Sequence, residues 1–145
     1  MRQRAAVVMK WFAALYVVTI VVAVFLAGEG IFRLNNVKNS DDCDKSGAHC
    51  IANSKTLDAH RGLGTILVLA SILFLIVALV AWHPNVRIRV VSIVVAILTF
   101  LQIVWAAIGG WVGGLHPVNA FLVLVLYGWL FHALKQQGSA PSPTS

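Results

Sequence analysis

The architecture of this chain follows first from Val90–Leu134, which reads VVSIVVAILTFLQIVWAAIGGWVGGLHPVNAFLVLVLYGWLFHAL. These 45 residues contain no Asp, Glu, Lys or Arg. A helix that crosses a bilayer needs about 20 apolar residues, so the stretch has room for two helices. The glycines and the proline of Gly109–Pro117 are dense enough to end one helix and begin the next. The stretch therefore predicts membrane helices over about residues 87–108 and 116–134.

Two shorter charge-free runs precede it: Trp11–Gly28, with 18 residues, and Gly62–Val86, with 25 residues. Each run is long enough for one span, which predicts helices over about residues 9–31 and 57–82. No run alternates with the period of two that a membrane β-strand requires. We therefore predict an all-α integral membrane four-helix bundle over about residues 1–135, followed by a disordered cytoplasmic tail over about residues 136–145.

The composition excludes several classes of protein. Of the 145 residues, 59% are hydrophobic and only 11% are charged. A soluble domain carries about 25% charged residues, so this chain has too few polar groups to cover a surface that faces water. A soluble globular enzyme, a nucleic-acid-binding domain and a disordered protein are therefore excluded. The expected partner is the lipid bilayer, and no nucleic acid is expected.

The charges are divided unequally between the two predicted sides of the membrane. The N-terminus, the turn after the second predicted helix and the C-terminus together carry six Lys and Arg and no acid. The other side carries five basic and five acidic residues. By the positive-inside rule, both termini are expected in the cytoplasm. The six basic residues are Arg2, Arg4, Lys10, Arg87, Arg89 and Lys135.

Both cysteines, Cys43 and Cys50, lie in the predicted outer loop between the first and second helices. Disulfides persist in the compartment on that side of the membrane, so we predict a disulfide between them. The pair could be a structural clip or a redox-active site. Its spacing is not Cys-x-x-Cys, which favours the clip.

Two of the five histidines, His60 and His116, fall at or near the outer start of a predicted helix. Their helices cross the membrane in the same direction, so we expect both histidines at a similar depth. Four positions after them, on the same helix face, come the small residues Gly64 and Ala120. A small residue at this position leaves a flat space beside the imidazole. Two such spaces that face each other could hold a planar macrocycle, with one imidazole on each side of a haem iron. The competing interpretation is a pair of interfacial histidines that bond to the backbone or to water.

The other polar side chains near the spans have simpler interpretations. Arg61 could pair with a haem propionate or could extend its charge to the membrane surface. Gln102, the most polar residue deep in a span, could bond to a ligand, although a hydrogen bond between helices is the simpler reading. His83 and His132 are expected at the inner interface with their polar tips in water. No third or fourth ligand for a zinc ion is evident near His60 and His116.

Two motifs carry a resemblance to a known family. These are Asp58–Gly64, which reads DAHRGLG, and Gly113–Ala120, which reads GGLHPVNA, with Gln102 between them. Together they resemble a family of small bacterial four-helix membrane proteins of unknown function, over most of the chain. The resemblance implies a multi-pass protein of the bacterial inner membrane and supplies no activity.

The layout is similar, more loosely, to one four-helix half of heme A synthase. That family has a cysteine pair in its first outer loop, a His-Arg pair that opens helix 2, and a histidine in helix 4. Cys43, Cys50, His60-Arg61 and His116 stand at those places here. The resemblance implies that both histidines are axial haem ligands and that the disulfide lies on a redox route.

The chain also departs from heme A synthase at two points. That family has a glutamate three residues before its helix-2 histidine, where this chain has Leu57, and it has a second four-helix half. We therefore expect a haem b carrier for electron transfer or haem handling, rather than an enzyme on its own, and assign no catalytic residue. A redox partner in the membrane or a second copy of the chain would be its protein partner. The alternative is a non-catalytic four-helix scaffold without a cofactor.

Overall fold

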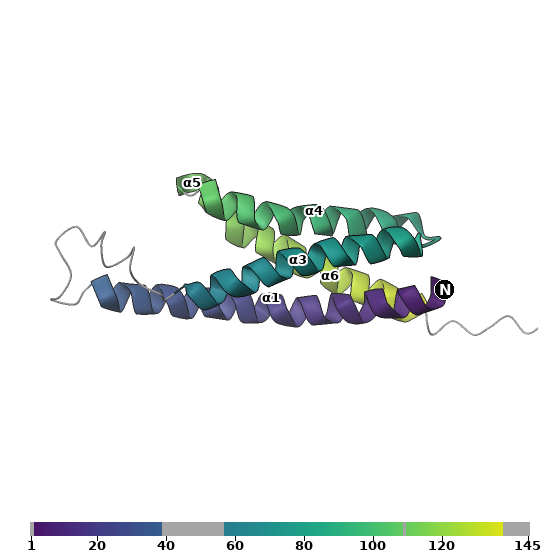
Figure 1. The fold of residues 1–145 in the computed structure, drawn as a ribbon, viewed down its shortest axis with the longest axis horizontal. Coiled ribbons are helices and arrows are strands. Elements are labelled where there is room, and N and C mark those ends of the chain that lie inside the picture. The colour runs from purple at the N-terminus through teal and green to yellow at the C-terminus, as the bar shows by residue number, and fades with distance from the viewer. Residues whose placement is uncertain (1, 39–56, 109, 138–145) are drawn as a thin grey trace, which may run out of the picture. The chain divides into compact units, whose positions relative to one another are not determined.

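The computed structural model describes residues 2–38, 57–108 and 110–137. The helices are α1 (Arg2–Lys38), α3 (Asp58–Ala81), α4 (Val86–Ile108), α5 (Gly110–Gly113) and α6 (Leu115–Gln137) (Figure 1). Within these ranges there is no β-strand. The prediction of an all-α fold is therefore confirmed.

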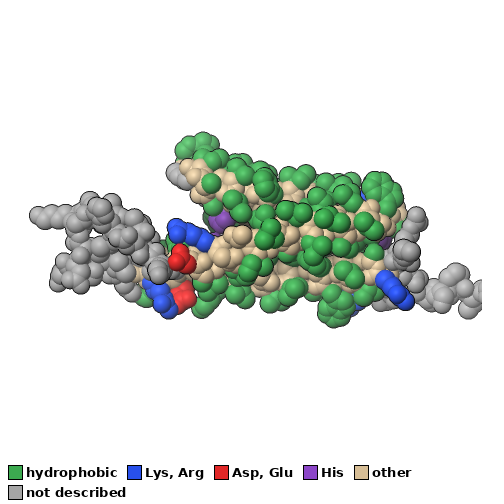
Figure 2. All heavy atoms as spheres, in the orientation of Figure 1, with side chains coloured by type: hydrophobic (Ala, Val, Ile, Leu, Met, Phe, Trp, Pro, Cys, Tyr) green, Lys and Arg blue, Asp and Glu red, His purple; other side chains and the backbone are tan. Residues whose placement is uncertain are grey.

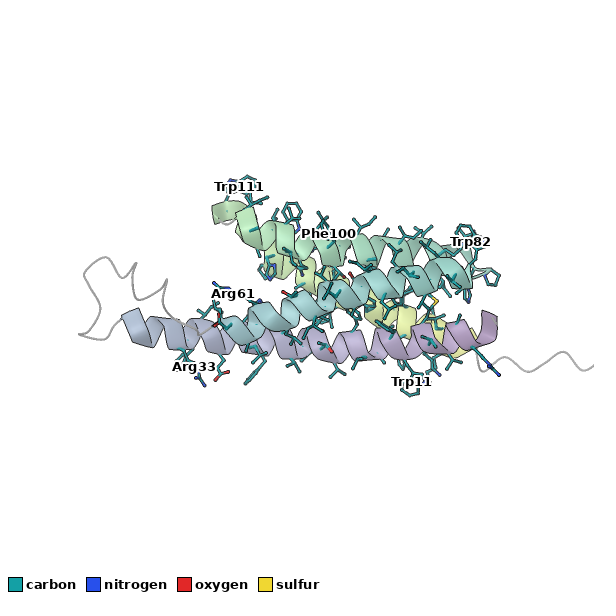
Figure 3. All side chains as sticks on the ribbon, viewed as in Figure 1. Trp11, Arg33, Arg61, Trp82, Phe100 and Trp111 are labelled. Carbon is teal, nitrogen blue, oxygen red and sulfur yellow. The ribbon has the colours of Figure 1, made fainter. Side chains whose placement is uncertain are left out.

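Four of these helices are long and apolar enough to cross a membrane, which agrees with the four predicted spans. The spans are Arg4–Arg33, Asp58–Ala81, Val86–Ile108 and Leu115–Gln136. Large apolar side chains face outward from them, among them Trp11 and Phe100 (Figure 3). Figure 2 shows apolar side chains over most of the visible helix surfaces, with Lys, Arg, Asp and Glu toward the helix ends. Such a surface suits a lipid solvent rather than water.

The observed helices differ from the predicted ranges mainly in α1, which begins at Arg2 and ends at Lys38. Arg, Gln and Ala are good helix formers, so the helix begins before the apolar run, and an i,i+4 pair between Glu29 and Arg33 supports it after the run stops. At about 1.5 Å per residue, α1 is longer than the roughly 30 Å hydrocarbon core. In the same way α6 continues to Gln137, so two residues assigned to the tail are helical.

The glycine-rich break separates α4 from α6, as the sequence predicts. The Gly114 N–H bonds to the Trp111 carbonyl at 3.0 Å, and a β-carbon at Gly114 would lie 3.0 Å from the same oxygen. This close approach favours glycine. Pro117 is the third residue of α6, where a missing N–H costs no intrahelical bond.

A short turn joins α3 to α4. Trp82, the residue after α3, has a φ of 37°, a left-handed conformation that is unusual for a side chain of this size. Its ring lies 4.6 Å from the Arg89 guanidinium, a cation–π contact that keeps an amphipathic ring at the helix end. The Asn85 side-chain oxygen accepts a hydrogen bond from the Arg87 N–H at 2.9 Å and caps α4.

The chain divides into two compact units, Met1–Ile20 with Leu67–Ser145, and Val21–Ile66. An aromatic cluster lies in the core of the first unit. The rings of Tyr16 and Tyr127 stack with centroids 4.2 Å apart, and Phe74 meets Tyr127 edge-on at 5.4 Å. The Tyr16 hydroxyl donates a hydrogen bond to the Leu67 carbonyl, which ties α1 to α3 within this unit.

Candidate functional site

His60 is the third residue of α3 and is half-buried in the second unit. Its Nδ1 lies 2.8 Å from the main-chain oxygen of Ala23 in α1. A carbonyl oxygen can only accept, so a neutral ring that makes this hydrogen bond carries its hydrogen on Nδ1 and its lone pair on Nε2. One turn further along α3, a β-carbon at Gly64 would meet no atom within 4 Å. There is therefore open space beside this face of the helix.

Arg61, next to His60, is exposed and pairs with a residue of its own helix. Its Nη1 lies 3.6 Å from Asp58 Oδ1. Both side chains are more than half exposed, so the pair contributes little to stability. Figure 3 shows Arg61 at the beginning of α3. Its pairing with a haem propionate stays a prediction.

His116 is the second residue of α6 and is half-buried in the first unit. Its Nδ1 lies 2.9 Å from the main-chain oxygen of Gln102 in α4. The contact repeats the arrangement at His60: a histidine near the start of one long helix reaches a main-chain carbonyl of the long helix before it. Ala120 follows one turn later and is also half-buried.

The Gln102 side chain joins α4 to the first turn of α6. In the amide orientation that pairs donors with acceptors, its Nε2 donates to the His116 carbonyl at 2.9 Å and its Oε1 accepts from the Ala120 N–H at 2.7 Å. The same Nε2 lies 3.0 Å from His116 Nδ1. Gln102 therefore meets His116 through both its side chain and its main chain.

Sequence reasoning overlooked Asn119, which is buried and donates to the Leu98 carbonyl at 2.8 Å. Leu98 and Gln102 lie one turn apart on α4, and His116 and Asn119 lie one turn apart on α6. The two helices are therefore joined by neighbouring polar contacts. The available signal was a second polar side chain three positions after His116, on the same helix face.

The remaining histidines have other roles. The prediction of a water-exposed His83 is wrong, because only 7% of the residue is exposed. The tight turn folds its ring inward, and its Nδ1 accepts from the Asn85 N–H at 3.1 Å. His132 is exposed, as predicted, and its Nε2 lies 2.8 Å from Gln136 Nε2. His49 and the predicted Cys43–Cys50 disulfide lie outside the described residues.

The donor set limits which metal centre these residues could form. Among the residues that the structure describes, no group of three or more His, Cys, Asp or Glu could hold a metal ion. A structural zinc site needs about four protein ligands. Haem iron takes four ligands from its own porphyrin and needs at most two from the protein. Each histidine has a hydrogen-bond acceptor at Nδ1, which would suit an axial ligand of haem, whereas the described residues do not make a complete zinc site.

The fold has four helices that are long and apolar enough to cross a membrane, which is typical of a multi-pass α-helical membrane protein. Comparisons with protein-family models, curated proteins and solved structures give no match to this chain. The resemblances to the small four-helix family and to heme A synthase therefore remain predictions that rest on the motifs around His60 and His116.

Proposed function

We propose that the protein binds haem b, with Nε2 of His60 and Nε2 of His116 as its two axial ligands. One repeated observation carries the proposal. Each Nδ1 lies within hydrogen-bond distance of a main-chain carbonyl on the preceding long helix, 2.8 Å at Ala23 and 2.9 Å at Gln102. A histidine that binds iron through Nε2 carries its hydrogen on Nδ1, and metal-binding histidines typically donate that hydrogen to such an acceptor.

His83 supplies a contrast within the same chain. Its Nδ1 accepts from a main-chain N–H, so the neutral ring carries its hydrogen on Nε2. That form offers no lone pair at Nε2, the nitrogen that the proposal assigns to iron. The acceptors at His60 and His116 are therefore not a general feature of histidines in this fold.

The small residues after each histidine support the same proposal. Gly64 has open space where a β-carbon would lie, and Ala120 presents only a methyl group. A planar porphyrin whose iron is bound by an imidazole nitrogen needs room next to the histidine, and small neighbouring residues leave that room. When bound, haem supplies an iron that takes up and releases one electron. The chain's own part is to hold the two imidazoles and to exclude water with its apolar spans.

The proposal includes a location and partners. We place the chain in the bacterial inner membrane with both termini in the cytoplasm, which puts both histidines toward the outer face. The charge distribution supports this orientation, because the proposed cytoplasmic side carries six Lys and Arg and no acidic residue. Electron transfer or haem handling would then involve a redox partner in the membrane or a second copy.

A non-catalytic scaffold without a cofactor is the second candidate function. The observation that favours it is the bond from Asn119 to the Leu98 carbonyl, which joins the same two helices as the His116 contact. In this bond a polar side chain joins α6 to α4 without a ligand. In this scheme the two histidines would act in the same way, as interhelical donors.

Absorption spectra of the purified protein, supplied with haem during expression, separate the two candidates. We expect a Soret band, about one haem per chain, and loss of haem in both His60→Ala and His116→Ala. His132→Ala is the matched control, because this histidine is exposed and contacts Gln136 of its own helix. A colourless wild-type protein, or unchanged haem content in both alanine variants, would overturn the haem proposal.

Methionine variants separate loss of a ligand from loss of the fold. His60→Met and His116→Met retain a side chain that can bind iron. Replacing one histidine ligand by methionine raises the reduction potential of haem iron. We therefore expect both variants to keep haem at a higher midpoint potential, which redox titration measures. An unchanged potential in both would exclude these residues as ligands.

A further inference from the structure

Gln102 offers His116 Nδ1 two different hydrogen-bond partners. Its main-chain oxygen, at 2.9 Å, can only accept, and its amide Nε2, at 3.0 Å, can only donate. A neutral imidazole carries its hydrogen on one of two nitrogens. If the hydrogen is on Nδ1, the ring can donate to the carbonyl. If it is on Nε2, Nδ1 can accept from the amide.

We propose that Gln102 is a positioning residue that pairs with His116 in both neutral tautomers. In the haem-free protein the amide stabilises the form with hydrogen on Nε2. With Nε2 held by iron, the ring hydrogen would be on Nδ1, where the Gln102 carbonyl could accept it. Nδ1 is thus paired before and after binding. This inference rests on the proposed haem function and assigns the residue that prepares one of its two ligands.

The remaining contacts of the amide hold it at this place. Its Nε2 also donates to the His116 carbonyl at 2.9 Å, and its Oε1 accepts from the Ala120 N–H at 2.7 Å. These two groups belong to residues four apart, which form the first turn of α6 around Pro117. An amide has two N–H groups, so one can serve the carbonyl while the other faces the imidazole.

The alternative role of Gln102 is purely structural: a hydrogen bond that joins α4 to α6. The chain offers a matched control for this alternative. Asn119 joins the same helices through the Leu98 carbonyl at 2.8 Å. Removing its amide breaks an interhelical bond and leaves both partners of His116 Nδ1 in place. An effect that appears at Gln102 and not at Asn119 is therefore specific to His116.

The test uses the full chain in micelles with ¹⁵N-labelled histidine, because two-bond ¹H–¹⁵N correlation spectra distinguish the two tautomers. The His116 signals are assigned from a His116→Gln variant. In the haem-free wild type we expect the Nε2–H form of His116 to be present. In Gln102→Met, which keeps the carbonyl and removes the donor, we expect that form to be lost and the Nδ1–H form to remain. Asn119→Leu should give the wild-type spectrum.

Absence of the Nε2–H form in the wild type would overturn the inference, as would its persistence in Gln102→Met or an equal change in Asn119→Leu. Gln102→Leu repeats the test with a different side-chain shape if the methionine variant does not fold. A haem titration of the same samples tests the proposed function separately. Loss of the Nε2–H form in Gln102→Met, together with no haem binding, would retain the assignment of Gln102 and reject the haem proposal.

Discussion

Tyr16 and Tyr127 stack against each other in the core of the first unit, but their hydroxyl groups differ. The Tyr16 hydroxyl donates to the Leu67 carbonyl and links α1 to α3. The Tyr127 residue is fully buried, and its hydroxyl makes no hydrogen bond of normal geometry in the part of the chain that the structure describes, although the hydroxyls of Tyr16 and Thr99 lie near it. A buried hydroxyl without a partner lowers stability by about 1–3 kcal/mol.

The two tyrosines therefore predict opposite effects of the same substitution. Tyr127→Phe removes a hydroxyl that makes no hydrogen bond of normal geometry and should leave stability unchanged or raise it by about 1 kcal/mol. Tyr16→Phe removes an interhelical bond and should lower stability by about 0.6 kcal/mol, the average for such bonds in membranes. Reversible unfolding in mixed micelles measures both free energies. A loss at Tyr127→Phe as large as that at Tyr16→Phe would show that the Tyr127 hydroxyl has a partner.

At the scale of single elements, the turn between α3 and α4 depends on two side chains that bond to the backbone. His83 accepts from the Asn85 N–H, and the Asn85 side chain accepts from the Arg87 N–H. These bonds lie directly after Trp82, the residue with a left-handed backbone that follows α3. The turn is thus held by polar contacts between side chains and the backbone.

Asn85→Ala should lower the free energy of unfolding by about 1 kcal/mol, because it removes the N-terminal cap of α4. Asn85→Asp keeps the acceptor oxygen and adds a negative charge near the positive end of the helix dipole, so it should be neutral or stabilising. Thermal unfolding followed by circular dichroism compares the two variants. Equal destabilisation by both would show that the hydrogen bond to Arg87 does not hold the turn.

Helix positions could be predicted closely where charges bound an apolar run. The predicted helix over residues 57–82 is α3 at Asp58–Ala81, and the one over 87–108 is α4 at Val86–Ile108. The ends of α1 could not be predicted in this way, because helix-forming polar residues continue it beyond the apolar run. A run without charged residues indicates which part of a helix would lie in the hydrocarbon core. The helix itself ends where its backbone hydrogen bonds end.

At the scale of the whole molecule, the proposed orientation predicts how the two cysteines react. They are the only cysteines of the chain and fall between the first and second spans. In intact cells, a membrane-impermeant maleimide should label both cysteines after mild reduction and neither before it. Mass spectrometry counts the added groups. Labelling that requires permeabilised cells would reverse the orientation, and labelling without reduction would exclude the disulfide.

The histidine sites show what each level of information decides. The sequence alone determines the four apolar spans, the asymmetry of charge and the places of His60 and His116 near helix starts, because these features depend on residue type and spacing. Only the tertiary structure identifies the carbonyls of Ala23 and Gln102 as their partners. Every residue has the same main-chain carbonyl, so no pattern of residue types distinguishes the one that a folded helix brings within hydrogen-bond distance of an imidazole.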